Sequence, residues 1–129
     1  MTRTLTSKPS KQRAALYNTH ANRRRRILSA SLSTELKTSQ GRNSYPVRKG
    51  DTVKILRGDF AGIEGKITRI DTKRQRVFVE GVSREKVAGT STNVSVHSSK
   101  VMITKLNLDD KWRADSIRAT VVKSSQEEA

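Results

Sequence analysis

The stretch GDTVKILRGDFAGIEGKITRI, residues 50–70, decides the fold predicted for this chain. Its apolar side chains alternate with polar ones, first at Val53 and Ile55 and then at Ile63 and Ile67. Alternation with a period of two is typical of a strand with one buried face. The stretch therefore predicts two strands joined by a tight turn at residues 57–61.

Glycines are concentrated in the same stretch. Four of the chain's seven lie there: Gly50, Gly58, Gly62 and Gly65. Glycine adopts positive φ without strain and leaves room for a neighbouring backbone. We interpret all four as structural turn glycines of a sharply bent sheet. Gly58 is expected to supply positive φ in the first hairpin turn, and Gly62 and Gly65 a bulge or a close backbone approach.

Further apolar alternations follow downstream. Ile70 breaks the parity of the second strand, which predicts a bulge or a strand end there. The later strands are predicted around three pairs: Val77 and Val79, Val94 and Val96, Val101 and Ile103. We expect a polar turn at residues 71–75, a longer loop at residues 84–92 and a turn at residues 97–100. About five short strands at this spacing predict a small, strongly bent barrel.

Positive charge dominates the composition. Twenty-seven Lys and Arg against twelve Asp and Glu give a net charge of +15, and only 33% of the residues are hydrophobic. Residues 1–49 carry twelve of the cations and one anion, Glu35, whereas residues 107–129 carry a net charge of −1. Such a balance favours a polyanionic partner, most often nucleic acid. We divide the chain into a basic, partly helical extension (1–46), a β-domain (47–106) and a short helical tail (107–129).

The extension has few strand signals, and short helices are predicted for it. Ser10 is expected to cap a first helix, Asn22 a second that runs from Arg23 to about Ala30, and Ser33 a third with Glu35 near its positive end. In the tail, a helix is expected to start at Asp109 or Asp110, with Trp112 as a packing anchor on the barrel or on a neighbouring protein rather than a base-stacking residue.

The sequence lacks the residues that several functional classes require. With no cysteine, disulfides and thiolate chemistry are excluded. The two histidines have no metal-ligand spacing, and no nucleophile–base pair is evident. No apolar run approaches the ~20 residues of a membrane span, and the N-terminus has no secretory signal pattern. We expect a cytoplasmic protein that is not an enzyme and has no cofactor or metal.

Candidate RNA-binding residues are the cations of the extension and of the barrel loops. Arg and Lys neutralise phosphates, and Arg also stacks on base planes. Tyr17 and His20 are candidates for stacking on unpaired bases, with a packing role equally open. The candidate cations are Lys8, Lys11, Arg13, Arg23, Arg24, Arg25, Arg26, Arg42, Arg48, Lys49, Lys54, Arg57, Lys66, Lys73, Arg74 and Arg76.

A family resemblance rests on these residues. VRKGDTVKILRGDFAGIEGKITRI resembles the KOW motif, and KQRAALYNTHANRRRRILSASLSTELKTSQGRNSYPVRKGD before it is similar to the N-terminal extension of one family of large-subunit ribosomal proteins. The bacterial members of this family carry the protein number twenty-four, and the eukaryotic members carry the number twenty-six. The tail lacks the Lys-rich extension of eukaryotic members, which favours the archaeal type.

The resemblance carries expectations. It implies an SH3-like five-stranded barrel (the KOW domain) and a structural constituent of the large ribosomal subunit. It also implies binding to the 5′ domain of large-subunit ribosomal RNA, neighbouring ribosomal proteins near the polypeptide exit tunnel, and a role in subunit assembly. DNA is not expected as a partner. Two alternatives stay open from the residues: a KOW-type transcription elongation module, whose usual preceding α/β domain would not fit in residues 1–49, and a membrane-active cationic protein.

Overall fold

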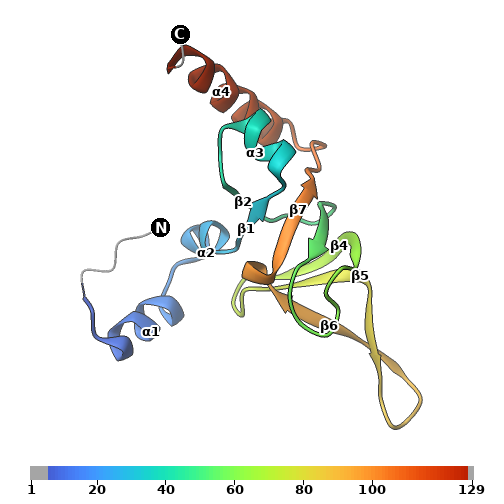
Figure 1. The fold of residues 1–129 in the computed structure, drawn as a ribbon. Helices are drawn as coiled ribbons and strands as arrows, with labels where there is room; N and C mark the ends of the chain where they lie inside the picture. The colour runs from blue at the N-terminus through green and yellow to red at the C-terminus, as the bar shows by residue number, and fades with distance from the viewer. Residues whose placement is uncertain (1–5, 128–129) are drawn as a thin grey trace.

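A mixed sheet forms the body of the protein. The computed structural model describes residues 6–127 and is shown in Figure 1. Its strands are β1 (Ser29–Leu32), β2 (Ser44–Pro46), β3 (Thr52–Ile55), β4 (Glu64–Asp71), β5 (Arg76–Glu85), β6 (Ser91–His97) and β7 (Val101–Lys105). Its helices are α1 (Pro9–Tyr17), α2 (Ala21–Ile27), α3 (Thr34–Gln40), the 3₁₀ turn η1 (Ser98–Lys100) and α4 (Lys111–Glu127).

Within these described residues the seven strands lie in the order β2-β1-β7-β3-β4-β5-β6. The mostly-β class and the strands predicted from residue 52 onward are confirmed. Although the extension has few strand signals, it holds two strands, because β1 pairs parallel with β7 and antiparallel with β2. The division at residues 46 and 106 stays a prediction, and two of the sheet's strands lie before the first boundary.

The core joins both parts of the sheet. Val53, Ile55, Val77 and Ile103 are almost fully buried, as the alternation predicted. Further buried side chains come from β1 and its flank: Leu28, Ala30 and Leu32. Burial of a Leu side chain contributes about 1.5–3 kcal/mol, so β1 is bound to the sheet by packing as well as by hydrogen bonds.

The predicted helix starts are confirmed only in part. Ser33 caps α3 by accepting a hydrogen bond from the Leu36 amide at 3.4 Å, as expected. The first helix starts at Pro9, with Lys8 rather than Ser10 before it, since proline fits the first helical position. The second starts after His20 rather than Asn22 and ends at Ile27, so Ala30 belongs to β1 and not to a helix.

The glycines act in two different ways. Gly65 lies where a Cβ would be 2.6 Å from the carbonyl oxygen of Glu80, so β4 and β5 approach closely there, as predicted. Gly50, Gly58 and Gly62 all have positive φ. For Gly62 the requirement is therefore its φ of 89° and not a close approach, because a Cβ there would have open space around it.

Turns and irregularities follow the prediction with one difference. A register shift between Ile67 and Arg69 is the expected bulge, and η1 provides the turn after His97. The loop predicted at residues 84–92 is shorter, because β5 runs to Glu85 and β6 starts at Ser91. The two strands form the hairpin that extends at the lower right of Figure 1.

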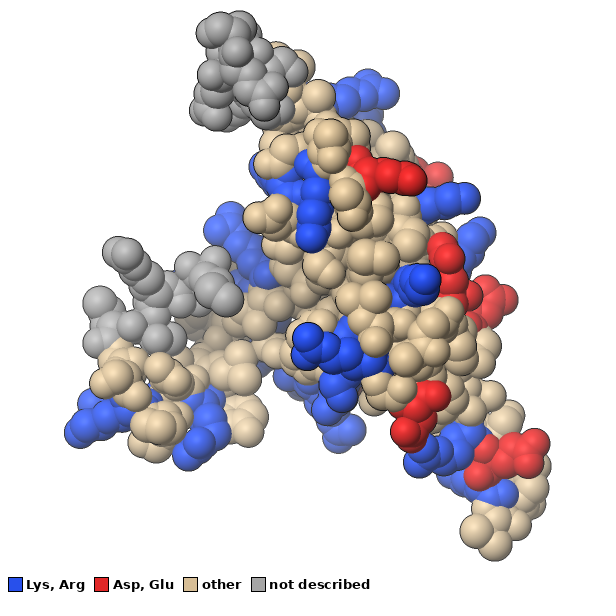
Figure 2. All heavy atoms as spheres, in the orientation of Figure 1, with Lys and Arg blue, Asp and Glu red and all other residues tan. Residues whose placement is uncertain are grey.

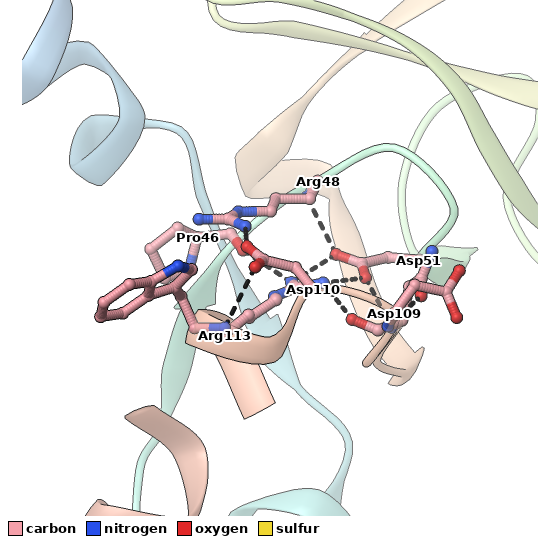
Figure 3. Close-up of polar contacts among 8 residues, drawn as sticks. Pro46, Arg48, Asp51, Asp109, Asp110 and Arg113 are labelled. Atoms are coloured by element: carbon pink, nitrogen blue, oxygen red, sulfur yellow. Dashed lines mark hydrogen bonds and ion pairs between the residues drawn. The ribbon is translucent and has the colours of Figure 1, made fainter. Parts of the chain in front are cut away.

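The tail docks by a buried ion pair instead of by tryptophan. Trp112 is 85% exposed, so the expectation that it packs on this domain is wrong, and its contact with a neighbouring protein stays a prediction. Of residues 111–122 of α4, whose burial the structure describes, Arg113 and Ile117 are buried. Figure 3 shows Arg113 between Asp51 and the Pro46 carbonyl. The helix begins at Lys111, one or two residues after the expected start.

Candidate nucleic-acid interface

The first helix stands apart from the sheet and presents its whole surface. None of the residues of α1 is buried, and the helix lies to the lower left of the body in Figure 1. Lys8, Lys11 and Arg13 are all exposed, and Tyr17 is 73% exposed. His20 is also exposed, directly before α2. Base stacking and packing were both left open for Tyr17 and His20. Neither residue packs into the core, and base stacking stays a prediction.

Four consecutive arginines form most of α2. Arg23, Arg25 and Arg26 are exposed and Arg24 is half-buried. Successive helical residues are about 100° apart, so the four side chains point in different directions around the helix. Three of them lie in its last turn, where the negative end of the helix dipole stabilises cations. The segment can therefore contact phosphates on more than one side.

A groove brings predicted cations from two segments together. It is lined by Arg25 of α2 and by Arg48 and Lys49, from the segment between β2 and β3. The other lining residues are Leu28, Pro46, Val47, Ile70, Thr72 and Asp110. The Arg48 guanidinium donates a hydrogen bond to Asp110 and thereby lowers the pKa of that carboxyl group. Arg48 is thus paired with a carboxylate, whereas Arg25 and Lys49 have none within salt-bridge distance among the residues that the structure describes.

The remaining predicted cations are exposed but scattered. Lys54 on β3 lies opposite Glu64 of β4, which weakens its field, and Lys66 lies opposite Thr52. Lys73 and Arg74 occupy the β4–β5 turn, where their amides donate to Asp71 Oδ1 at 3.1 and 3.2 Å. Arg42 precedes β2, with its guanidinium 5.9 Å from the Tyr45 ring centroid.

A second cleft is lined by cations that were predicted separately or were not predicted from the sequence. Arg57, from the loop after β3, and Arg76 of β5 line it, as predicted candidates. Arg84, Lys100 and His97 line the same cleft and were not among the candidates. His97 and Lys100 are close in sequence, but their proximity to Arg76 depends on the pairing of β5 with β6, which places Arg76 opposite His97. Burial, and then the charges of Arg76 and Lys100, lower the pKa of His97.

Basic and acidic side chains are distributed unevenly over the surface. In the face seen in Figure 2, Lys and Arg lie both over the N-terminal helices and over the sheet, while Asp and Glu gather toward the other side. Among the described residues, no group of three or more His, Asp or Glu side chains is arranged to hold a metal ion. None of the described helices is both long and apolar enough to cross a membrane.

The fold and the surface together define a small, strongly basic β-protein with a projecting cationic helix and two cation-lined depressions. Sequence comparison narrows this class. Residues 6–119 match the family described as ribosomal proteins L26 of eukaryotes and L24 of archaea. The chain is 50% identical over 116 residues to a protein named large ribosomal subunit protein uL24 from Korarchaeum cryptofilum, across 90% of this chain and 88% of that one.

A second relative agrees. The protein of the same name from Sulfolobus acidocaldarius is 47% identical over 113 residues, which cover 88% of this chain and 84% of the relative. The chain therefore belongs to the family of large-subunit ribosomal proteins that comprises eukaryotic L26 and archaeal L24. The family is structural and non-enzymatic, and its place in the cytoplasmic large ribosomal subunit agrees with the expected localisation.

Proposed function

We propose that the chain binds large-subunit ribosomal RNA in its 5′ domain, close to the polypeptide exit tunnel and to neighbouring ribosomal proteins, and that it contributes to assembly of the subunit. Strands β3 to β7 would form the SH3-like KOW barrel, with β1 and β2 added to one side. Family membership supports the ribosomal setting, and the charge supports RNA as the direct partner.

The observation that supports the proposal is that the cationic helices α1 and α2 contain no buried residue. Seven predicted cations lie on or beside helices that have no buried residue: Lys8, Lys11, Arg13, Arg23, Arg24, Arg25 and Arg26. Helices as short as these do not persist in water on their own. A partner with densely spaced phosphates would both neutralise the arginines and fix the helices. Release of counterions then makes affinity fall as salt rises.

Binding to a transcript of the 5′ domain tests this proposal. The full chain is compared with a variant that lacks residues 1–19, which removes α1 but leaves Leu28 and β1 in place. We expect the shortened chain to stay folded, to bind more weakly and to show a flatter dependence of affinity on salt. A control variant replaces two exposed cations outside the extension, Lys105 and Lys111, with Gln.

Two results would contradict the proposal. One is an unchanged affinity and salt slope after removal of residues 1–19, which would exclude the first helix from the interface. The other is failure of the full chain to protect any nucleotide of the 5′ domain in chemical footprinting of large-subunit RNA. Co-sedimentation with RNA polymerase instead of large subunits would favour the transcription elongation module.

A further inference from the structure

The second cleft lies at the end of the sheet opposite α4. It is formed by the loop between β3 and β4, by β5 and β6, and by η1. Ile55, Phe60 and Val96 provide apolar walls, and Ile55 and Val96 belong to the buried core. Packing in the core therefore fixes the walls formed by Ile55 and Val96, which support the polar side chains around the cleft.

Charge around this cleft is strongly unbalanced. Four cations line it, Arg57, Arg76, Arg84 and Lys100, against one acid, Asp59. Asp59 already accepts a hydrogen bond from Arg84 at 3.3 Å. Arg57, Arg76 and Lys100 have no carboxylate within salt-bridge distance among the described residues. An anion is the ligand that this arrangement would stabilise.

His97 adds a donor of defined geometry. Its Nδ1 accepts a hydrogen bond from the Ser99 amide at 3.2 Å and lies 2.8 Å from Ser99 Oγ. In the neutral ring the proton is therefore on Nε2, because the Ser99 amide can only donate. If Nδ1 gains a proton, this N–H can donate a hydrogen bond to Ser99 Oγ, and the Ser99 amide then loses its acceptor. A charged ring therefore still has a hydrogen-bond partner at Nδ1.

We propose that this cleft binds one phosphate group of the RNA, with Arg57, Arg76, Lys100 and His97 as its ligands, and that binding there strengthens as the pH falls. The inference rests on the proposed RNA-binding function and adds a defined phosphate site to it. It also gives a role to a histidine that neither metal binding nor catalysis accounts for.

The sign of the pH effect follows from the charges that face His97. In the free protein, burial and then Arg76 and Lys100 lower the pKa of His97 below its usual value of 6.5. Arg57 and Asp59 from the β3–β4 loop and Arg84 of β5 complete the charged groups of the cleft. A phosphate offsets the cations and attracts the imidazolium, so the pKa of His97 is higher in the complex. A group with a higher pKa in the complex takes up a proton on binding, and affinity therefore increases as the pH falls through that range.

The test measures affinity for the 5′-domain transcript at constant ionic strength between pH 7 and pH 5.5. This window lies below the titration of the α-amino group and above that of most carboxylates. Three proteins are compared: the unaltered chain, His97→Asn and His20→Asn. Asn at position 97 retains an oxygen to cap the Ser99 amide but cannot titrate. His20 is the chain's other histidine and lies outside the cleft.

We expect affinity to rise as the pH falls, by up to about tenfold for each pH unit when one proton is taken up. The rise should disappear in His97→Asn and persist in His20→Asn. Lys100→Gln should weaken binding more than Lys105→Gln, which removes an exposed cation of β7 outside the cleft. Should His97→Asn fail to fold, this lysine pair still tests the site.

Other outcomes distinguish the phosphate site from RNA binding in general. RNA binding that does not depend on pH, or a pH dependence that His20→Asn removes, would overturn the phosphate site but leave RNA binding intact. No binding at any pH would overturn the proposed function itself. If inorganic phosphate alone raises the pKa of His97 in NMR titrations while RNA binding is pH-independent, the cleft takes the free ion and the proposal is wrong.

Discussion

The ion pair between Asp51 and Arg113 is the contact whose loss we expect to be most costly. The two side chains are 0% and 2% exposed, and Arg113 Nη1 and Nη2 donate to the two Asp51 oxygens at 2.6 and 2.7 Å. The amides of Arg48 and Asn107 donate to the same carboxylate, each at 2.9 Å. Arg113 also donates to the Pro46 carbonyl. One cluster therefore connects β2, the residue before β3, the segment after β7 and α4 (Figure 3).

Arg113→Ala leaves the Asp51 carboxylate buried with two backbone amides and no counter-charge. Removing one partner of a buried ion pair costs about 3–5 kcal/mol, mainly because the other charge stays desolvated. Domains are stable by about 5–15 kcal/mol, so the loss is a large part of the total. With a urea dependence of about 2 kcal/mol per molar, a loss of about 4 kcal/mol lowers the unfolding midpoint by about 2 M.

Urea unfolding monitored by circular dichroism measures this loss, with Arg118→Ala as the matched control. Arg118 is an exposed arginine on the same helix, and its removal should change stability by no more than about 0.5 kcal/mol. Hydrogen exchange should also accelerate in α4 of Arg113→Ala, because the helix loses its principal anchor. The reasoning is refuted if the two variants have the same midpoint, since the buried pair would then contribute no more than a surface residue.

Three further predictions concern single positions and are measured by thermal or urea unfolding. Gly65→Ala should destabilise by about 1–3 kcal/mol, because its Cβ would be 2.6 Å from the Glu80 carbonyl oxygen; an unchanged stability would mean that β4 and β5 separate at little cost. Leu32→Ala, at 1% exposure, should cost about 2–5 kcal/mol, whereas Leu16→Ala, at 42%, should cost little; equal losses would contradict the placement of β1 in the core. Trp112→Ala should leave stability nearly unchanged, since its side chain is 85% exposed, and a large loss would restore it as a packing anchor.

Local pattern was sufficient to predict the strands from residue 52 onward. Val53, Ile55, Val77 and Val79 alternate strictly, and all four are buried. The close approach at Gly65 was also predictable, because a glycine inside an apolar alternation often marks a bulge or a close contact with another backbone. These features depend on residues that are adjacent in sequence, so a single strand carries the whole signal.

Strand β1 was missed although a signal for it exists. Leu28, Ala30 and Leu32 share one parity and all are buried, which is the pattern of a strand. The preceding arginines favoured a continuing helix, and four residues are too few for the alternation to outweigh that preference. What decides in favour of a strand is its parallel pairing with β7, for example Leu32 with Ile103, which is a contact between distant parts of the chain.

For the candidate site, the sequence predicted which residues are charged but not how they group in space. Composition identified the cations, and most of them are exposed as expected. Composition does not show which of them are already paired: Arg48 donates to Asp110, and Lys54 lies opposite Glu64. Nor does it show that Arg76 and Lys100 converge on His97. Because a phosphate is bound by unpaired charges that converge on one place, the fold rather than the number of cations determines where a phosphate would bind most strongly.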